Sequence, residues 1–98
     1  MCGIAGEVNL KKINSINSGY LKTLCHRGPH NSSHVKVSEN LNFYHTRLKI
    51  IDLTDQSNQP MVSDDKRFTI SYNGELYNYL DLKKKLQRFG FKFKTNGD

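Results

Sequence analysis

The stretch Leu41-Asn42-Phe43-Tyr44-His45-Thr46-Arg47-Leu48-Lys49-Ile50-Ile51-Asp52 shows the side-chain alternation, with a period of two, that is typical of a β-strand. One face of this strand would carry His45 and Arg47 and is therefore unusually polar. Residues His34–Val37 predict a second strand, joined to the first by a turn at Glu39-Asn40. The sequence thus predicts a pair of strands near the middle of the chain.

Another strand and a helix are predicted before this pair. Cys2–Asn9 alternates small or apolar residues with polar ones, and its two glycines permit close approach of another backbone. The helix would be capped by Asn17 or Ser18 and ended by Gly28-Pro29, because proline cannot continue a helix.

The second half of the chain predicts a loop, two strands and a helix. Thr54–Pro60 has no period and is polar, so it is expected to be a loop, and Arg67–Tyr72 is the next strand. A helix would begin at the cap Asn78 and end at Gly90, which suits a left-handed C-terminal residue. A short strand, Phe91–Lys94, precedes a final turn. This order of elements indicates a layered α+β architecture.

Length and composition limit the class of protein. The chain has 98 residues, 36% hydrophobic and 24% charged, as in one small globular domain. Because no more than two apolar residues occur in a row, we expect neither a membrane span nor a signal peptide, and a cytoplasmic location by default. The two cysteines would then stay thiols. The net charge of +6 favours anionic partners without specifying one.

Cys2 has the most unusual position of any residue in the sequence. Removal of Met1 would place a thiol and a free α-amine on the same residue. An α-amine has a pKa of about 7.7–8.0, so it can take the proton of the thiol directly or through a water. Cys2 is therefore a candidate nucleophile. The simpler interpretation, a small hydrophobic residue that starts a strand, stays open.

Arg47 shares its strand face with His45 and Lys49. A guanidinium that faces inward needs a carboxylate partner. Its planar fork matches the α-carboxylate of a substrate, but an internal salt bridge to Asp or Glu would serve the fold equally well. Both interpretations stay open from the residues alone.

Tyr72-Asn73-Gly74-Glu75 lies between a predicted strand and a predicted helix. The Asn-Gly pair is a turn signal that requires no function. The Asn73 amide and the Gly74 N–H can also donate to one oxygen, as stabilisation of a tetrahedral oxyanion requires. Glu75 and Asp98 would then bind a substrate ammonium, and otherwise they are solvated surface acids.

Two other kinds of site are not expected. The cationic run Lys83–Lys94 is most simply a solvated face, and no aromatic-rich pattern accompanies it to indicate nucleic-acid binding. A metal site is not expected either, because Gly28-Pro29 interrupts the helix that would align its ligands. The candidate ligands were Cys25, His26, His30 and His34.

Taken together, five segments resemble the glutaminase domain of class II glutamine amidotransferases, and within that family the asparagine synthetase branch. They match in the right order and span the chain. The segments are Met1–Gly6, His26–Pro29, His45–Leu53, Asn58–Met61 and Tyr72–Tyr79. The first four residues of the last segment, with Arg27-Gly28-Pro29, favour this branch over sugar-phosphate or purine-pathway amidotransferases.

The resemblance implies an N-terminal nucleophile hydrolase fold, a four-layer αββα sandwich. It also implies hydrolysis of glutamine to glutamate and ammonia. Domains of this family are longer and are normally followed by an ATP-using synthetase domain, so residues 1–98 would form an incomplete glutaminase domain. No cofactor is implied for the glutaminase half, and ATP and Mg²⁺ are expected only on the absent synthetase domain.

The resemblance assigns catalytic roles to three residues. Cys2, once N-terminal, would attack the γ-amide carbon of glutamine, with its own α-amine as general base. The Asn73 side chain and the Gly74 N–H would hold the oxyanion. The reaction would pass through a thioester that water then hydrolyses.

Glutamine binding is assigned to four further residues by the same resemblance. Arg47 would clamp the α-carboxylate of glutamine, and Glu75 and Asp98 would hold its α-ammonium. The backbone carbonyl of Ile50 would assist, since the strand backbone there lines the glutamine pocket in similar proteins.

The sequence departs from the family pattern next to the signature Arg27-Gly28-Pro29. His30 stands where an aspartate usually closes that signature, and a glycine expected shortly afterwards is missing at Asn31-Ser32-Ser33. The loop near the nucleophile is therefore expected to differ in geometry from the family pattern.

The main hypothesis is a glutaminase that supplies ammonia to an asparagine synthetase-like amidation on a missing domain or on a partner chain. Residues 1–98 alone are expected to be weakly active or inactive, because half of the sandwich is missing. The alternative is a non-catalytic, truncated amidotransferase-like module that pairs with another chain, and this module would tolerate replacement of Cys2. The ammonia acceptor and homo-oligomerisation stay open.

Overall fold

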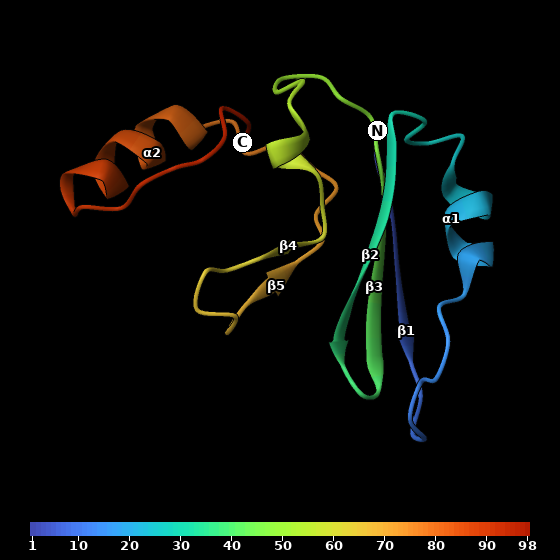
Figure 1. The fold of residues 1–98 in the computed structure, drawn as a ribbon. Coiled ribbons are helices and arrows are strands. Elements are labelled where there is room, and N and C mark those ends of the chain that lie inside the picture. The colour runs from blue at the N-terminus through green and yellow to red at the C-terminus, as the bar shows by residue number, and fades with distance from the viewer.

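A computed structural model describes residues 1–98, the whole sequence (Figure 1). Five strands and two α-helices make an α+β fold, which confirms the predicted class. The elements in chain order are β1 (Gly3–Val8), α1 (Ser18–Leu24), β2 (Asn31–Ser38), β3 (Leu41–Arg47), the 3-10 turn η1 (Asp55–Ser57), β4 (Met61–Val62), β5 (Thr69–Ile70) and α2 (Tyr79–Arg88).

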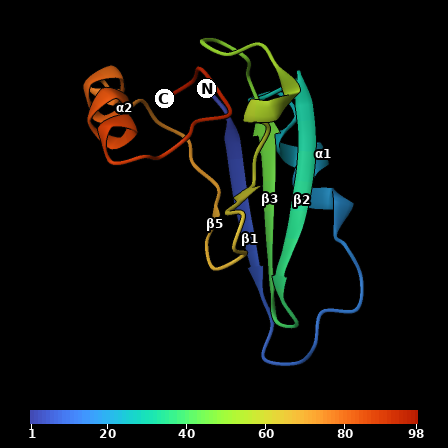
Figure 2. The same cartoon turned by 60° about the vertical axis from the view of Figure 1, so that its left-hand side comes forward.

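The main sheet has three antiparallel strands in the order β1-β3-β2. Gly3 pairs with Thr46 and Asn31 pairs with Arg47, so the start of β1 and the start of β2 both lie beside the end of β3. α1 lies on one side of this sheet, and the small β4–β5 hairpin lies on the other (Figures 1 and 2). The central position of β3 places Arg47 where several parts of the chain converge.

Tyr44 of β3 forms the centre of the core and is fully buried. Its ring packs against Tyr20 of α1, with ring centroids 5.0 Å apart. Its hydroxyl donates to Glu7 Oε2 at 2.7 Å and accepts from the Asn17 N–H at 3.1 Å. One side chain therefore ties β1 and the start of α1 to the central strand, and satisfies its own buried hydroxyl.

α1 begins at the predicted cap but ends at Leu24, before the predicted stop at Gly28-Pro29, and residues 25–27 form a turn. Asn17 is its N-cap, with a side-chain oxygen that accepts from the Gly19 N–H at 3.0 Å. After the helix, Gly28 packs directly on β3, because a Cβ at this position would overlap the Thr46 carbonyl and lie 2.5 Å from the Arg47 nitrogen. A glycine is needed there to bring the signature loop against the end of β3.

α2 extends from Tyr79 to Arg88 and also confirms its prediction. Gly90 follows it with φ +89°, the left-handed conformation expected after a helix. Asn78 stands at the N-cap position but its side chain makes no capping hydrogen bond, contrary to the prediction. α2 lies apart from both sheets, and its apolar Leu80 and Phe89 are exposed (Figures 1 and 2).

Several predicted strand boundaries are wrong. β3 ends at Arg47, so residues 48–52 form a loop instead of continuing the strand. Phe91–Lys94 is not a strand, because no neighbouring strand pairs with it, and Arg67–Tyr72 contributes only β5. β4 was not expected at all. A strand needs a hydrogen-bonded neighbour, which side-chain alternation in one segment does not reveal.

The four-layer αββα sandwich implied by the family resemblance stays a prediction. The structure has one three-stranded sheet, one two-stranded hairpin and two helices. None of its helices has both the length and the apolar composition needed to cross a membrane.

Candidate active site

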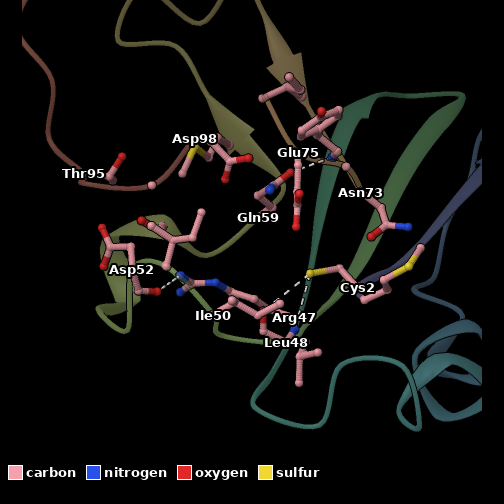
Figure 3. A pocket seen from close by; sticks show the side chains of 18 of the residues that line it. Cys2, Arg47, Leu48, Ile50, Asp52, Gln59, Asn73, Glu75, Thr95 and Asp98 are labelled. Carbon is pink, nitrogen blue, oxygen red and sulfur yellow. Dashed lines mark hydrogen bonds between the residues drawn. The ribbon is translucent and has the colours of Figure 1, made fainter. Parts of the chain in front are cut away.

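A cavity of about 500 Å³ lies beside the start of β1 and the end of β3 (Figure 3). Segments from distant parts of the sequence line it: the chain start, the loop after β3, the segment after β5 and the chain end. All seven predicted site residues are among the lining residues, namely Cys2, Arg47, Ile50, Asn73, Gly74, Glu75 and Asp98. The fold therefore brings the whole predicted set to one place.

Cys2 lines this cavity and lies immediately before β1. Its sulfur is half-buried and accepts a hydrogen bond from the Leu48 backbone N–H at 3.3 Å. The Cys2 thiol also donates to the Leu48 carbonyl, with sulfur and oxygen 3.8 Å apart, so the Leu48 backbone fixes the position of the sulfur. The Cys2 carbonyl accepts from Arg27 Nε at 3.1 Å, which links the nucleophile candidate to the signature loop.

Gly3 explains why the chain start is so closely fixed. A Cβ at this position would lie 2.6 Å from Thr46 Oγ1 and 2.9 Å from the Leu24 Cβ. The strand start is therefore packed against both β3 and α1 without room for a side chain.

Met1 also lines the cavity, with 71% of its surface exposed. While Met1 is present, the nitrogen of Cys2 belongs to a peptide bond and cannot act as a base. Removal of Met1 would create an amine beside the sulfur of Cys2 and open the adjacent part of the cavity wall. The sequence predicts the first of these effects but not the second.

Arg47 is buried, with 7% of its surface exposed, and no carboxylate pairs with it. Its Nη1 donates to the Thr54 carbonyl at 2.6 Å and to Asn58 Oδ1 at 2.9 Å, and its Nη2 donates to the Asp52 carbonyl. These neutral acceptors orient the guanidinium and leave its positive charge uncompensated. Of the two interpretations of Arg47, the internal salt bridge is therefore wrong.

Asn73 and Gly74 line the cavity and follow β5 after Ser71 and Tyr72. Asn73 lies on the Cys2 side of the cavity (Figure 3). The Tyr72 backbone N–H before them donates to Gln59 Oε1 at 2.6 Å. The Tyr72 ring folds over Gly74, where an added Cβ would lie 2.5 Å from the Tyr72 hydroxyl. The conformation of this short segment is thus set by a glutamine from another loop and by its own tyrosine.

Glu75 and Asp98 supply two carboxylates to the cavity, and Glu75 points into it (Figure 3). Asp98 Oδ2 accepts from the Leu76 N–H at 2.8 Å, which holds the chain end against the segment after Gly74. Arg47 lies across the cavity from these two acids (Figure 3). Positive and negative groups are therefore separated as a zwitterionic amino acid requires.

Ile50 belongs to the loop after β3, where its side chain is 66% exposed. Its backbone carbonyl accepts none of the hydrogen bonds within the chain. The carbonyl is therefore free to accept from a molecule in the cavity.

Sequence reasoning missed the contact residues behind this site. Gln59 was part of a recognised segment but had no predicted role, and Asp52 was only the end of a predicted strand. His30 now has a defined contact, because its Nδ1 accepts from the Lys49 backbone N–H at 3.0 Å. A histidine nitrogen thus supplies an acceptor to the loop after β3, a role that a carboxylate oxygen can also fill.

His45 lies behind the cavity and does not line it. It is fully buried, with Nε2 3.4 Å from the Tyr72 carbonyl and Nδ1 without a partner. Burial, assisted by the positive charge of Arg47, lowers the pKa of His45 below its usual value. The polar character of this strand face therefore comes from one neutral and one charged side chain.

The histidines that were considered as candidate metal ligands make other contacts. His26 Nδ1 lies 3.0 Å from the Thr23 carbonyl, and the His34 ring lies against Tyr44. No group of three or more His, Cys, Asp or Glu side chains is arranged to hold a metal ion.

The chain belongs to the glutamine amidotransferase domain family, which matches residues 1–98. Its curated relatives are glutamine-hydrolysing asparagine synthetases, so the predicted branch of the family is also confirmed. Asparagine synthetase [glutamine-hydrolyzing] 3 of Bacillus subtilis is 38% identical over 104 residues, covering 100% of this chain and 17% of the relative.

Two further relatives show the same partial coverage. Asparagine synthetase [glutamine-hydrolyzing] of Zea mays is 38% identical over 103 residues, covering 100% of this chain and 17% of its own length. Asparagine synthetase [glutamine-hydrolyzing] 1 of Bacillus subtilis is 31% identical over 111 residues, covering 100% of this chain and 16% of the relative. The chain thus spans about a sixth of these relatives. No solved structure matches it.

Proposed function

We propose that this chain forms a glutamine-hydrolysing site that releases glutamate and ammonia. One observation carries the proposal: a single cavity contains a cysteine at position 2, an unpaired arginine, an Asn-Gly pair and two carboxylates. Membership of the glutamine amidotransferase domain family supports glutamine as the substrate.

Glutamine would bind by its α-amino acid group. The free donors of Arg47 take the α-carboxylate, because Nε and one Nη2 hydrogen are not used inside the protein. Glu75 and Asp98 take the α-ammonium, with the Ile50 carbonyl as an additional acceptor. This orientation directs the side-chain amide toward Cys2.

The first half-reaction forms a thioester. After removal of Met1, the α-amine of Cys2 takes the thiol proton, and the thiolate forms a bond to the amide carbon of glutamine. The Asn73 amide and the Gly74 N–H donate to the oxyanion of the tetrahedral intermediate. Its collapse breaks the carbon–nitrogen bond, and the departing nitrogen takes the proton from the α-ammonium and leaves as ammonia.

The second half-reaction returns the enzyme to its starting state. The neutral α-amine of Cys2 takes a proton from water, and the hydroxide attacks the thioester carbon. The same oxyanion donors act again. Collapse releases glutamate, and the thiolate with its neighbouring α-ammonium is regenerated.

We assign residues 1–98 to an αββα glutaminase domain that further protein surface completes. Exposed apolar side chains support this assignment, since only Ile13 and Tyr44 among the hydrophobic residues are buried. Glutamate release by residues 1–98 alone is accordingly expected to be weak or absent.

The ammonia would pass to an amidation step like that of the asparagine synthetases. That step would reside on a synthetase domain or a separate synthetase chain. Glutamine hydrolysis needs no cofactor, because the thiol and amine of Cys2 supply nucleophile and base. ATP and Mg²⁺ would serve the amidation step.

Binding of L-glutamine tests the proposal without requiring turnover. We expect a Met1-free Cys2→Ala chain to show saturable NMR shift changes at cavity residues, and the Cys2→Ala/Arg47→Ala chain to lose them. A matched control is Cys2→Ala/Arg67→Ala, which removes an exposed arginine outside the cavity. Absence of shifts in the first chain would leave the non-catalytic module as the better interpretation.

A further inference from the structure

Asp52 is a buried carboxylate that takes no part in the proposed reaction. It is 6% exposed and lies at the back of the cavity, in the loop after β3. A carboxylate buried this far must be compensated by hydrogen bonds or an ion pair. Its contacts therefore show what it contributes to the site.

The carboxylate of Asp52 accepts from two different segments. Oδ1 accepts from the Thr54 N–H at 2.8 Å and the Thr54 hydroxyl at 2.6 Å, within its own loop. Oδ2 accepts from the Asn96 N–H at 2.8 Å, 44 residues away along the chain. The hydrogen bonds from Thr54 and Asn96 hold the pKa of Asp52 well below its usual range, so the group is an anion at neutral pH.

The Asn96 contact reaches Asp98 through one intervening residue. Gly97 packs on Asp52, since an added Cβ at Gly97 would lie 3.6 Å from the Asp52 Cβ. Asp98 then reaches the Leu76 N–H at 2.8 Å. Two lysines also hold the chain just before this segment: Lys83 Nζ donates to the Thr95 carbonyl at 2.8 Å, and Lys94 pairs with Asp64. Asp52 is thus the contact that joins the chain end to the body of the site.

The backbone of Asp52 contacts the residue that would bind the α-carboxylate. Its carbonyl accepts from Arg47 Nη2. One residue therefore contacts Arg47 directly and reaches Asp98 through Asn96 and Gly97.

We propose that Asp52 is a positioning residue that sets the distance between Asp98 and Arg47, and so selects ligands carrying both an α-ammonium and an α-carboxylate. The inference rests on the proposed glutamine site. Its side chain anchors the segment that carries Asp98 through Asn96, and its backbone carbonyl accepts from Arg47. Replacing the side chain therefore acts chiefly on the ammonium end.

Asp52→Asn is the informative change. The amide keeps the size of the side chain and can still accept from Thr54, but its NH₂ group then faces the Asn96 N–H, donor against donor. Asn96 and Asp98 lose their anchor, while the carbonyl of residue 52 continues to accept from Arg47. Asp65→Asn is the matched control, because Asp65 is an exposed acid outside the cavity that bonds to Ser63 and Arg67 and not to the chain end.

The test compares two ligands in the Cys2→Ala background: L-glutamine and its deamino analogue, 4-carbamoylbutanoate. In the Cys2→Ala chain that keeps Asp52, glutamine should bind at least about tenfold more tightly than the deamino analogue. Only glutamine presents a charged donor, its α-ammonium, to Glu75 and Asp98. Asp52→Asn should reduce this preference to within about twofold, with binding of the deamino analogue nearly unchanged. A merely structural loss would weaken both ligands equally.

A second measurement is independent of ligand binding. Amide hydrogen exchange at Leu76 should accelerate several-fold in Asp52→Asn and not in Asp65→Asn, because the Asp98 acceptor is released. Thr54→Val, which removes one bond to Asp52 and leaves its charge, should shift exchange and ligand preference in the same direction by less. This variant gives the answer if Asp52→Asn does not fold.

The outcomes separate the two claims. An unchanged preference for glutamine in Asp52→Asn, together with unchanged Leu76 exchange, overturns the positioning role and leaves the glutamine site standing. Failure of the parent chain to bind either ligand overturns the glutamine site and with it the role of Asp52 in ligand selection.

Discussion

Single residues in this site are held mainly by backbone groups and uncharged side chains. The Cys2 sulfur accepts from a backbone N–H, and Arg47 donates to two carbonyls and an amide. Such contacts orient a reactive group without neutralising it, because they bring no opposite charge. The site is therefore preorganised for a charged ligand.

Gln59 offers a test of this preorganisation. Its Oε1 accepts from the Tyr72 N–H at 2.6 Å, and its backbone carbonyl accepts from the Ser33 hydroxyl of β2. Gln59→Leu removes the acceptor beside Asn73-Gly74, and we expect about 1 kcal/mol lower stability and about tenfold slower modification of Cys2 by an electrophilic glutamine analogue.

Two variants serve as controls for Gln59. Gln59→Glu keeps an acceptor oxygen and should restore most of the modification rate. Gln56→Leu changes an exposed glutamine of the same loop and should have no effect. Wild-type modification kinetics in Gln59→Leu would show that the Tyr72 contact does not position the oxyanion segment.

His45 predicts how stability depends on pH. Because its pKa is lowered in the folded state, the unfolded chain takes up a proton on this imidazole at a higher pH than the folded chain. Protonation therefore favours unfolding, and stability should fall as the pH drops below about 6.5. Asp52 contributes nothing in this range, since its pKa is lowered from an already acidic value.

Urea unfolding at about pH 7.5 and about pH 5.5 measures the effect of His45. The midpoint should be lower at the acidic pH, and His45→Gln should reduce the difference. His26→Gln, which changes an exposed histidine, is the control. An equal pH difference in wild type and His45→Gln would contradict the assignment of this dependence to His45.

Secondary-structure elements meet at the end of β3, where β1, β2 and the signature loop all contact its last residues. Pro29 forms a parallel bridge to Arg47, and the His30 N–H donates to the Arg47 carbonyl at 3.0 Å. Gly28 packs on the preceding residue of the same strand. The signature loop therefore shapes the site through the β3 backbone.

Gly28→Ala tests this close approach. The added methyl group would overlap the Thr46 carbonyl, so either the loop or β3 must move, at a cost of about 1–3 kcal/mol. Denaturant unfolding should show this loss. Gly6→Ala is the control, because its Cβ would be 3.8 Å from Phe43, and we expect neutral or slightly improved stability. Equal stability of the two variants would contradict the packing described for Gly28.

The sequence predicts the elements better than their ends. Alternation located β1 and β3, and the cap at Asn17 located α1. The end of β3 was missed because the Leu48 and Lys49 N–H groups bond to Cys2 and His30 instead of a strand partner. Those partners come from distant segments, so no local pattern reveals them.

The predicted site residues could be found from the sequence, whereas the residues that position them could not. Resemblance to the family located the seven predicted site residues, and all of them except Asp98 occupy one of the five matching segments. Asp52 and Gln59 act through bonds to Asn96 and Tyr72, and such pairings depend on the folded chain. Their roles therefore emerge only from the structure.

In the whole molecule, α1 and the main sheet support one side of the cavity, and many apolar side chains elsewhere are exposed. α1 and the main sheet hold Cys2 and Arg47, whereas α2 and the chain end contribute Asp98 from a part that lies apart from both sheets (Figure 2). Exposed apolar residues include Ile4, Phe89 and Phe91. A covering surface would stabilise the arrangement as well as hide these side chains.

The most direct measurement is the intact mass of the chain before and after exposure to an electrophilic glutamine analogue. We expect loss of Met1 and a single adduct that requires Cys2, persists in Cys25→Ala and is suppressed by free L-glutamine. No adduct on the Met1-free chain, or an adduct that remains in Cys2→Ala, would contradict a glutamine site built around Cys2.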